Sequence, residues 1–342
     1  IDQGNLQHMP LINKKGYNIN FVTSFFGPKP YNTGDGMRAL ASTAEKEGVE
    51  IFYSTPAEQL VTGDGGKVTG VIAKDESGKY IQFNASKGVI LATGDYMNNE
   101  AMVKRWCPDV DGFDKKQYQK TGDGHIMAID AGAKMENLGH TKMMHDFDSG
   151  LMYEEPFLYV NMEGKRFMNE ATWVQGKCVG VMVNGGSDHA WSVFDANWQT
   201  DLLDSLQYGG GMFWDSFRAY GTDYQVAVDS HTKTVEGGLE KVPDYYKRAD
   251  TLEELAEMLD VDKDEFLKSV ERYNKMCEAG VDTDFYKTAD KLISIGADDG
   301  PFYGASFSPG FLTSLGGLRT DSDLRVLDEN ASRSKACSTP DA

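Results

Sequence analysis

The chain has 342 residues, of which 40% are hydrophobic, 11% aromatic and 25% charged, a globular composition with room for about two domains. Acidic residues outnumber basic ones by 53 to 34, and the net charge of −19 argues against a nucleic-acid partner and an anionic membrane surface. The four cysteines form no CxxC, CxxCH or Cys/His pattern, and no apolar run approaches the roughly 20 residues that span a bilayer. A zinc site, covalent haem, a disulfide framework and a membrane span in this sequence are therefore not expected.

The first predicted elements follow from local spacing. Met37, Leu40 and Ala44 stand at i, i+3 and i+7 and predict an amphipathic helix over 34–47. Alternating residues over 49–53 then predict a strand. Glycine-rich turns separate the strands of a small antiparallel meander, which we expect at 59–61, 68–73 and 80–83.

A different kind of strand is predicted at 87–95. Its residues Val89–Ala92 are apolar without alternation, which is typical of a strand buried on both faces of a parallel sheet. The run ends at Thr93–Gly94, where a glycine allows a ligand to approach the main chain. Further on, Thr121–Gly124 opens a predicted helix whose N–H groups suit an anion or an electron-rich ring edge, although a helix cap is the more common role of such a motif.

The character of the chain changes from about Lys142, where aromatic residues and methionines become dense. Gly209–Gly211 is interpreted as a flexible hinge or loop. Capped amphipathic helices are predicted from Thr251 and over 262–278, and a strand is predicted at 325–327. Elements rich in strands thus flank a mixed middle region that carries helices.

Few polar residues stand out as chemical candidates. His140 and His145 fall at the predicted domain junction, a common place for ligand sites, although a lone histidine is more often structural. Arg166 and Glu170 stand four residues apart beside an aromatic residue, and we interpret them as a structural ion pair. No Ser or Cys shows a pairing with His that would indicate nucleophilic catalysis.

Taken together, these segments resemble the flavoprotein family of fumarate reductases and succinate dehydrogenases. The resemblance extends from about Gly34 to Asn330. It is carried by the order and spacing of residues 89–94 with 98–102, 121–133, 160–170, 270–285 with 301–303, and 316–327.

The resemblance implies an α/β fold, in which a truncated FAD-binding domain of the glutathione-reductase-like type is interrupted by an α+β capping domain. It assigns 1–141 to a partial FAD-binding domain with the meander, 142–311 to a capping and substrate domain, and 312–342 to a return into the FAD-binding domain. The family's N-terminal G-x-G-x-x-G loop, which holds the pyrophosphate, has no counterpart, so we expect the sequence to be a fragment. A frame shifted by one base near residue 331 would permit the family's continuing pattern, and we expect a frameshift or sequencing error there.

The cofactor that the resemblance implies is FAD, and no metal site is expected. By this resemblance, the contacts to adenine follow the strand predicted at 49–53. The contacts on the nucleotide side fall at Thr93–Gly94, and those to the flavin fall at 122–124. The residues placed at FAD in this way are Thr55, Ala57, Glu58, Thr93, Gly94, Asp95, Gly122, Asp123, Gly124, Gly316 and Gly317.

Two departures from the family bear on the substrate. Fumarate reductases carry an arginine proton donor shortly after the Asn-Glu pair, where this chain has Val174 and no adjacent arginine. A histidine that holds a substrate carboxylate just before Gly316–Gly317 is also absent. Trp173, Phe311 and Leu312 instead indicate a larger and less charged substrate.

The candidates that remain for catalysis are His145, Tyr153 and Tyr159. His145 roughly matches the other carboxylate-binding histidine of the family and would hold one acid or carbonyl group. A tyrosine donor would fit a pocket that lacks the arginine, although core packing is the more typical role of Tyr153, Tyr159 and Tyr303.

The activity implied by the resemblance is that of an FAD-dependent oxidoreductase of the CH–CH group, which reduces the activated C=C bond of an unsaturated acid or enone other than fumarate. Two alternatives stay open, a desaturase like 3-ketosteroid dehydrogenase and a non-catalytic fragment that binds flavin or another ligand. The expected partners are a small molecule with an activated C=C bond and an electron donor or acceptor that the sequence does not identify. The cytoplasm and the cell envelope of a bacterium both fit this expectation.

Overall fold

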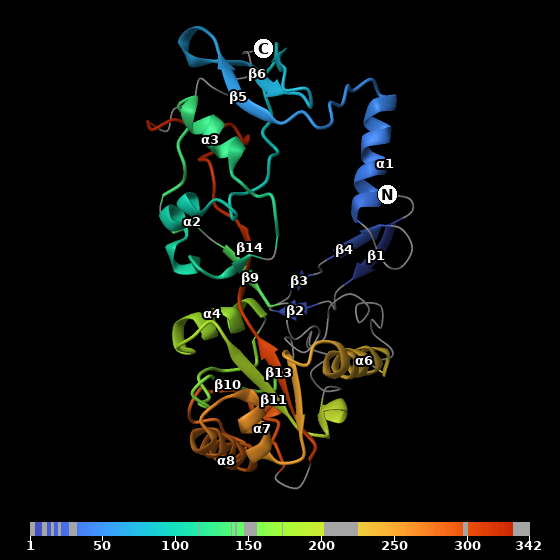
Figure 1. Cartoon of the computed structure of the whole chain (residues 1–342), viewed down its shortest axis with the longest axis vertical. Coiled ribbons are helices and arrows are strands. Elements are labelled where there is room, and N and C mark those ends of the chain that lie inside the picture. Colours follow the sequence, from blue (N-terminus) through green and yellow to red (C-terminus); the bar gives the residue numbers. More distant parts are fainter. Residues whose placement is uncertain are drawn as a thin grey trace. The chain divides into compact units, whose positions relative to one another are not determined.

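The computed structural model describes residues 4–8, 12–14, 17–19, 22–26, 33–115, 117–137, 139–140, 142–146, 156–172, 174–201, 225–296 and 300–330. The chain forms two compact units (Figure 1). Unit 1 comprises Ile1–Thr43 and Met144–Gly310, and unit 2 comprises Ala44–Met143 and Phe311–Ala342. The predicted hinge Gly209–Gly211 lies outside the described residues.

The first elements of the chain are two antiparallel strand pairs and a helix. β1 (Gly4–His8) pairs with β4 (Val22–Phe26), and β2 (Ile12–Lys14) pairs with β3 (Tyr17–Ile19). Helix α1 (Thr33–Lys46) confirms the helix predicted over 34–47. Its apolar face is nevertheless exposed, with 64% of Met37 and 60% of Leu40 accessible, because no described segment covers it.

Unit 1 is built on a four-stranded antiparallel sheet with the order β10-β11-β13-β12. The strands are β10 (Leu158–Asn161), β11 (Ala190–Phe194), β12 (Tyr246–Ala249) and β13 (Phe302–Phe307). Neighbouring side chains on a strand point to opposite faces, and all five residues of β11 are buried, so both faces of the sheet are covered.

Helices cover the two faces of this sheet (Figure 1). On one face, Leu158 and Phe302 belong to a core cluster with residues of α7 (Leu252–Leu259) and α8 (Lys263–Ala279). On the other face, Phe194 belongs to a second cluster with residues of α6 (Gln225–Lys241). Unit 1 is therefore a three-layered arrangement of helices, sheet and helix.

Helices α7 and α8 confirm the two capped helices predicted from the sequence. The Thr251 hydroxyl accepts a hydrogen bond from the Glu254 amide at 3.2 Å, and the Asp262 carboxylate accepts one from the Glu265 amide at 2.9 Å. Helix α8 ends at Gly280, whose φ of 63° lies in the left-handed region that favours glycine. Local capping chemistry thus sets the bounds of both helices.

The Asp262 cap gives a testable expectation. We expect Asp262→Ala to lower the free energy of unfolding by about 1 kcal/mol, because alanine leaves the Glu265 amide without its acceptor. Urea unfolding followed by circular dichroism measures this change, with Lys263→Ala at the neighbouring exposed position as the control. Equal stability of the two variants would contradict the assignment.

Unit 2 contains the predicted meander as an antiparallel sheet of order β5-β6-β7. The strands are β5 (Ala57–Thr62), β6 (Val68–Lys74) and β7 (Tyr80–Asn84). Helix α3 (Asp123–Asp130) confirms the helix predicted after Thr121, and its Met127 is buried in a cluster with Leu60 and Val68. Val89 and Leu91 pack against the same cluster.

Three predicted strands are wrong. The residues over 87–95 form no strand, and Ile90 is 93% exposed, because only the side that carries Val89 and Leu91 is packed and no described strand pairs with the other. Residues 49–52 are irregular and lead into a turn at 53–54, and none of them pairs with a described strand. Residues 325–327 form only a bridge between Val326 and Thr320, rather than a strand of a sheet.

The remaining elements are short. A three-stranded sheet has the order β8-β14-β9, with β8 at Asp114–Lys115, β9 at Lys142–His145 and β14 at Gly310–Ser314. The other helices are α2 (Glu100–Trp106), α4 (Val174–Asn184) and the 3₁₀ turns Asp64–Gly66, Pro108–Val110 and Ala289–Lys291. Within the described part of the chain, no helix has both the length and the apolar character that crossing a membrane requires.

Candidate functional site

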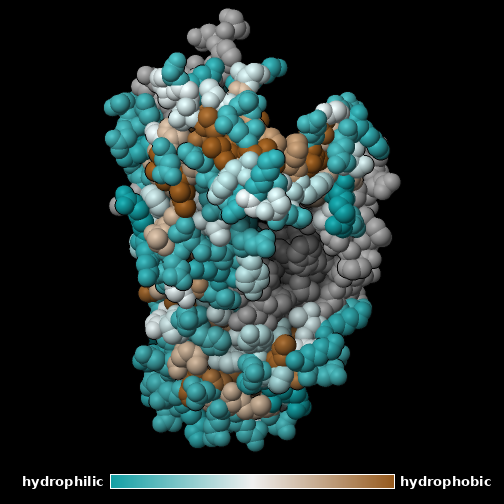
Figure 2. Space-filling model, turned by 45° about the horizontal axis from the view of Figure 1, so that its top comes forward, coloured by the Kyte–Doolittle hydropathy of each residue, from teal (hydrophilic) through white to brown (hydrophobic). Residues whose placement is uncertain are grey.

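A cavity of about 710 Å³ lies within unit 2. This volume is in the range of small-molecule and cofactor sites. Its lining consists of residues 87–94, Gly124, His125, Leu318, Thr320 and residues 323–326. Ile90 and Leu324 are 93% and 81% exposed, and Figure 2 shows hydrophobic side chains gathered at the surface in the upper part of the view. The wall thus combines aliphatic side chains with main chain and a few polar side chains, such as His125, Asp323 and Arg325.

The two motifs singled out by the sequence meet at this cavity. A Cβ on Gly124 would stand 2.0 Å from the Thr93 hydroxyl oxygen, so the Thr93 side chain rests directly on the Gly124 main chain. Gly94 has a φ of +77°, and a Cβ there would lie 3.2 Å from the Lys120 ammonium nitrogen. Both positions need glycine, one for close approach and the other for its backbone conformation.

Helix α3 begins at the edge of the cavity. Its N-cap Gly122 has a φ of 74°, and its carbonyl accepts the Ile126 amide at 3.0 Å. The amides of the first turn, which include those of Gly124 and His125, have no acceptor inside the helix and carry its positive dipole end. The exposed Asp123 carboxylate accepts the Thr121 hydroxyl at 2.8 Å, so that side chain caps its own loop.

The other predicted cofactor residues have different positions. Asp95 is buried and accepts hydrogen bonds from the Thr313 hydroxyl and from the Ser314 amide at 3.2 Å, so it anchors β14 and does not line the cavity. Thr55 donates its hydroxyl to the Tyr53 carbonyl at 2.7 Å, also away from the lining. Ala57 starts β5 and packs on its core, while the Glu58 side chain next to it is exposed.

The glycine pair Gly316–Gly317 lies beside two histidines. A Cβ on Gly316 would stand 2.4 Å from the His140 ring, and a Cβ on Gly317 would stand 3.1 Å from Nε2 of His125. His125 lines the cavity and was not a candidate of the sequence analysis. Its position directly after the Thr121–Gly124 motif was the signal that could have indicated it.

A buried aromatic cluster includes His140 in unit 2. The Tyr96 hydroxyl lies 2.5 Å from Nδ1 of His140 and 3.4 Å from the Cys107 sulfur, and Trp106 stacks on His140 with a centroid distance of 6.0 Å. Burial raises the pKa values of the Tyr96 hydroxyl and the Cys107 thiol above their usual range. These contacts hold His140 inside the protein and indicate a structural role for it.

The candidates for catalysis are in unit 1 or outside the described residues. His145 is buried at the end of β9, with Nδ1 2.5 Å from the Asp146 carbonyl oxygen. Tyr159 is buried in β10, where its ring contacts Phe307 at 5.4 Å and the Lys177 ammonium at 4.7 Å. Tyr303 stacks on Phe194, while Tyr153 and Trp173 lie outside the described residues. The catalytic roles of His145, Tyr153 and Tyr159 stay predictions.

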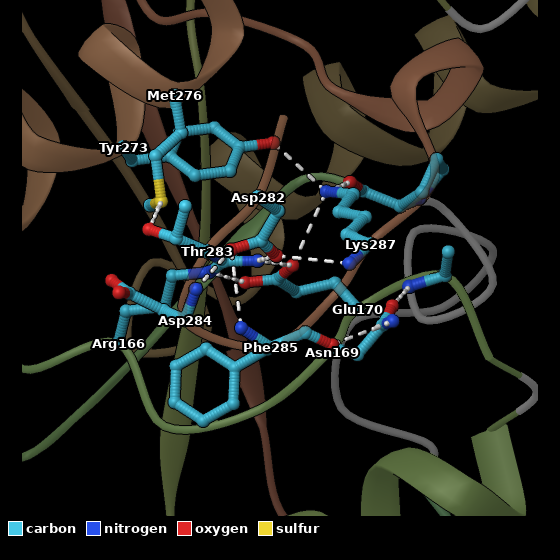
Figure 3. A network of polar contacts seen from close by, with 12 residues as sticks. Arg166, Asn169, Glu170, Tyr273, Met276, Asp282, Thr283, Asp284, Phe285 and Lys287 are labelled. Carbon is cyan, nitrogen blue, oxygen red and sulfur yellow. Dashed lines mark hydrogen bonds and ion pairs between the residues drawn. The ribbon is translucent and has the colours of Figure 1, made fainter. Parts of the chain in front are cut away.

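The Arg166–Glu170 ion pair is present and forms part of a larger buried network in unit 1 (Figure 3). Arg166 donates two hydrogen bonds to Glu170, at 2.8 and 2.9 Å, and two to Asp282, at 3.0 and 2.8 Å. Lys287 donates to the Tyr273 hydroxyl at 2.8 Å and lies 3.2 Å from Glu170. The contacts of Asp282 and Lys287 were missed, because they come from a distant part of the chain.

The charges of the buried cations and carboxylates in this network balance one another. Burial alone would raise the pKa of Glu170, but Lys287 and Arg166 outweigh it and hold that pKa below its usual value. Burial lowers the pKa of Lys287, against the opposing effect of Glu170. Two cations and two carboxylates thus compensate one another away from water, which indicates a structural role.

Comparison with protein families identifies the class of the chain. Residues 28–335 match the model of the FAD binding domain family. The chain therefore belongs to this family, and FAD is the cofactor that this membership assigns to it.

Individual relatives support the same class. The chain is 26% identical over 314 residues to the vinyl phenol reductase of Lactiplantibacillus plantarum, covering 85% of this chain and 60% of the relative. It is 27% identical over 304 residues to the NADH:acrylate oxidoreductase of Vibrio harveyi, covering 85% of this chain and 27% of the relative. The chain thus spans only part of the length of these curated relatives.

A solved structure shows the same fold. The 3-ketosteroid delta1-dehydrogenase of Sterolibacterium denitrificans, in complex with 1,4-androstadiene-3,17-dione, matches with a TM-score of 0.64 and 26% identity. The match covers 88% of this chain and 56% of that chain. The mixed α/β fold expected from the sequence is confirmed at this level.

Proposed function

We propose that the chain is part of an FAD-dependent oxidoreductase that reduces an activated C=C bond, and that FAD binds in the cavity of unit 2. The observation that carries the proposal is the meeting of Thr93, Gly124 and Leu318 around this cavity. Relatives named as a vinyl phenol reductase and an acrylate oxidoreductase support the choice of reaction.

The residues of the cavity fit the cofactor. Gly94 and Gly124 line the cavity, and the lack of a Cβ lets the side chains of Lys120 and Thr93 pack against their main chain. Part of the surface that a flat ring would meet is therefore main chain. The first turn of α3 offers amides and a positive dipole end to the polar edge of that ring. When bound, FAD supplies hydride transfer, and the task of the protein is to position it and exclude water.

We further propose that residues 142–311 form a capping domain that carries the substrate side of the site. Unit 1, in which Ile1–Thr43 joins Met144–Gly310, supports this proposal because its second segment has its own sheet and cores. His145 is the proposed ligand of an acid or carbonyl group of the substrate. Tyr153 and Tyr159 are the proposed proton donors in place of an arginine.

The substrate proposed is an unsaturated acid, vinylphenol or enone rather than fumarate, because Val174 stands near the position where an arginine donor is expected. We expect the FAD-loaded protein to oxidise reduced viologen with vinylphenol, cinnamate or an enone at least about tenfold faster than with fumarate. Absorbance of the viologen under anaerobic conditions measures this rate. A preference for fumarate would contradict the proposed substrate class.

A second candidate is a desaturase of 3-ketosteroids, favoured by the structural match to a 3-ketosteroid dehydrogenase. Reduction of an artificial dye with a 3-ketosteroid tests it in the opposite direction of electron flow. Dye reduction without turnover of any alkene would favour this desaturase. Protein that holds FAD but turns over neither panel would indicate a non-catalytic flavin-binding protein.

A further inference from the structure

His125 lines the cavity of unit 2, and its Nδ1 has no hydrogen-bond partner among the described residues. It is the third residue of α3 and lines the cavity of unit 2. Its Nδ1 is buried and unpaired within the part of the chain that the structure describes. The ring is held by an edge-to-face contact with Tyr96, with centroids 5.5 Å apart and planes at 86°. Packing fixes the ring, while the hydrogen-bonding capacity of Nδ1 is left unused.

The surroundings of His125 differ from those of His140 in the same unit. His140 has the Tyr96 hydroxyl 2.5 Å from its Nδ1 and stacks on Trp106, so its polar atoms are used inside the protein. Nε2 of His125 lies instead 3.1 Å from the place of a Cβ on Gly317, the residue before Leu318 of the cavity lining. A glycine at 317 leaves this room for the imidazole.

The charge state of His125 suits a hydrogen bond to a neutral polar ring. Burial lowers its pKa, the Asp95 carboxylate opposes this effect and His140 adds to it. The imidazole is therefore neutral near pH 7, with one nitrogen that donates and one that accepts. Because Nδ1 has almost no accessible surface, Nε2 beside Gly317 is the nitrogen through which the imidazole can hydrogen-bond to a ligand in the cavity.

We propose that His125 is a direct contact of the flavin, and that its imidazole hydrogen-bonds to the polar edge of the isoalloxazine ring. This inference rests on the proposed placement of FAD in the cavity of unit 2. It assigns a cofactor-contacting role to a side chain, where the neighbouring glycines contribute main chain only.

Three variants test the contact through binding rather than turnover. His125→Leu removes both nitrogens, His125→Gln keeps a polar atom near the position of Nε2, and Ile126→Ala changes the next, exposed residue of the same helix. We expect His125→Leu to raise the dissociation constant of FAD about tenfold, His125→Gln to keep most of the wild-type affinity, and Ile126→Ala to leave it unchanged. Quenching of FAD fluorescence measures the constants, and thermal unfolding confirms that each variant is folded.

A second measurement does not depend on any variant remaining folded. The imidazole ¹⁵N resonances of His125 in the wild-type protein are expected to shift when FAD is added. Unchanged resonances, or tight FAD binding by His125→Leu, would overturn the contact while leaving the proposed function intact. A wild-type protein that binds no FAD would overturn both the cofactor placement and the contact that rests on it.

Discussion

Replacing Glu170 with alanine is expected to lower the free energy of unfolding by about 3–5 kcal/mol, because it leaves buried cations without their counter-charge. Among the described residues, Arg166 would keep Asp282 as its carboxylate partner, and Lys287 would keep neutral partners such as the Tyr273 hydroxyl. All of these side chains are almost completely buried, so water does not replace the lost carboxylate. Urea unfolding followed by tryptophan fluorescence measures the loss.

An exposed pair on the same unit provides the control. Glu271 and Lys275 form an ion pair on α8 with side chains that are 67% and 68% exposed. Glu271→Ala removes the same kind of carboxylate, and we expect no measurable change in stability because solvent screens this pair. Similar losses for the two variants would contradict the role assigned to burial.

The same network predicts an acid-sensitive fold. Burial acts to raise the pKa values of Glu170 and Asp282, but their cationic partners outweigh it and hold them below their usual 4.5 and 3.8. A carboxylate with a lowered pKa in the folded state stabilises the fold above the unfolded-state value, and this contribution is lost as the pH falls. Glu170→Gln should therefore lose less stability than the wild type between about pH 5 and pH 3, as measured by urea unfolding at each pH.

The sequence predicted features that depend on neighbouring residues. In the caps at Thr251 and Asp262, the side chain accepts a hydrogen bond from the amide three residues later, and both helices begin where the pattern indicated. The Arg166–Glu170 pair is likewise a contact between residues four apart. Asp282 completes the same network from 116 residues away, and no local pattern reports such a contact.

The predicted strand at 87–95 was wrong for a related reason. An apolar run such as Val89–Leu91 favours a strand, but a strand exists only when another segment offers its hydrogen bonds. No described segment does so, and the run lines a cavity with Ile90 exposed. Thr93 nevertheless lies against Gly124 at the cavity, so the structure brings together the two motifs that the sequence singled out.

That contact leads to the second large effect, at Gly124. A Cβ at this position would stand 2.0 Å from the hydroxyl oxygen and 3.0 Å from the Cβ of Thr93, so Gly124→Ala forces the cavity wall apart. We expect the variant to lose about 1–3 kcal/mol of stability through overpacking. We expect FAD affinity to fall at least about tenfold, because the displaced Thr93 enters the space proposed for the cofactor.

Two further variants test this prediction, a Gly→Ala control at a position with free space and a second substitution that removes the clash. Gly237 lies inside α6, and a Cβ added there would have no atom within 4 Å, so Gly237→Ala should stabilise the helix slightly and leave FAD binding unchanged. Adding Thr93→Ala to Gly124→Ala removes the hydroxyl that clashes and should recover part of the lost affinity. Isothermal titration with FAD compares the variants, and wild-type affinity in Gly124→Ala would show that the cofactor does not bind against this wall.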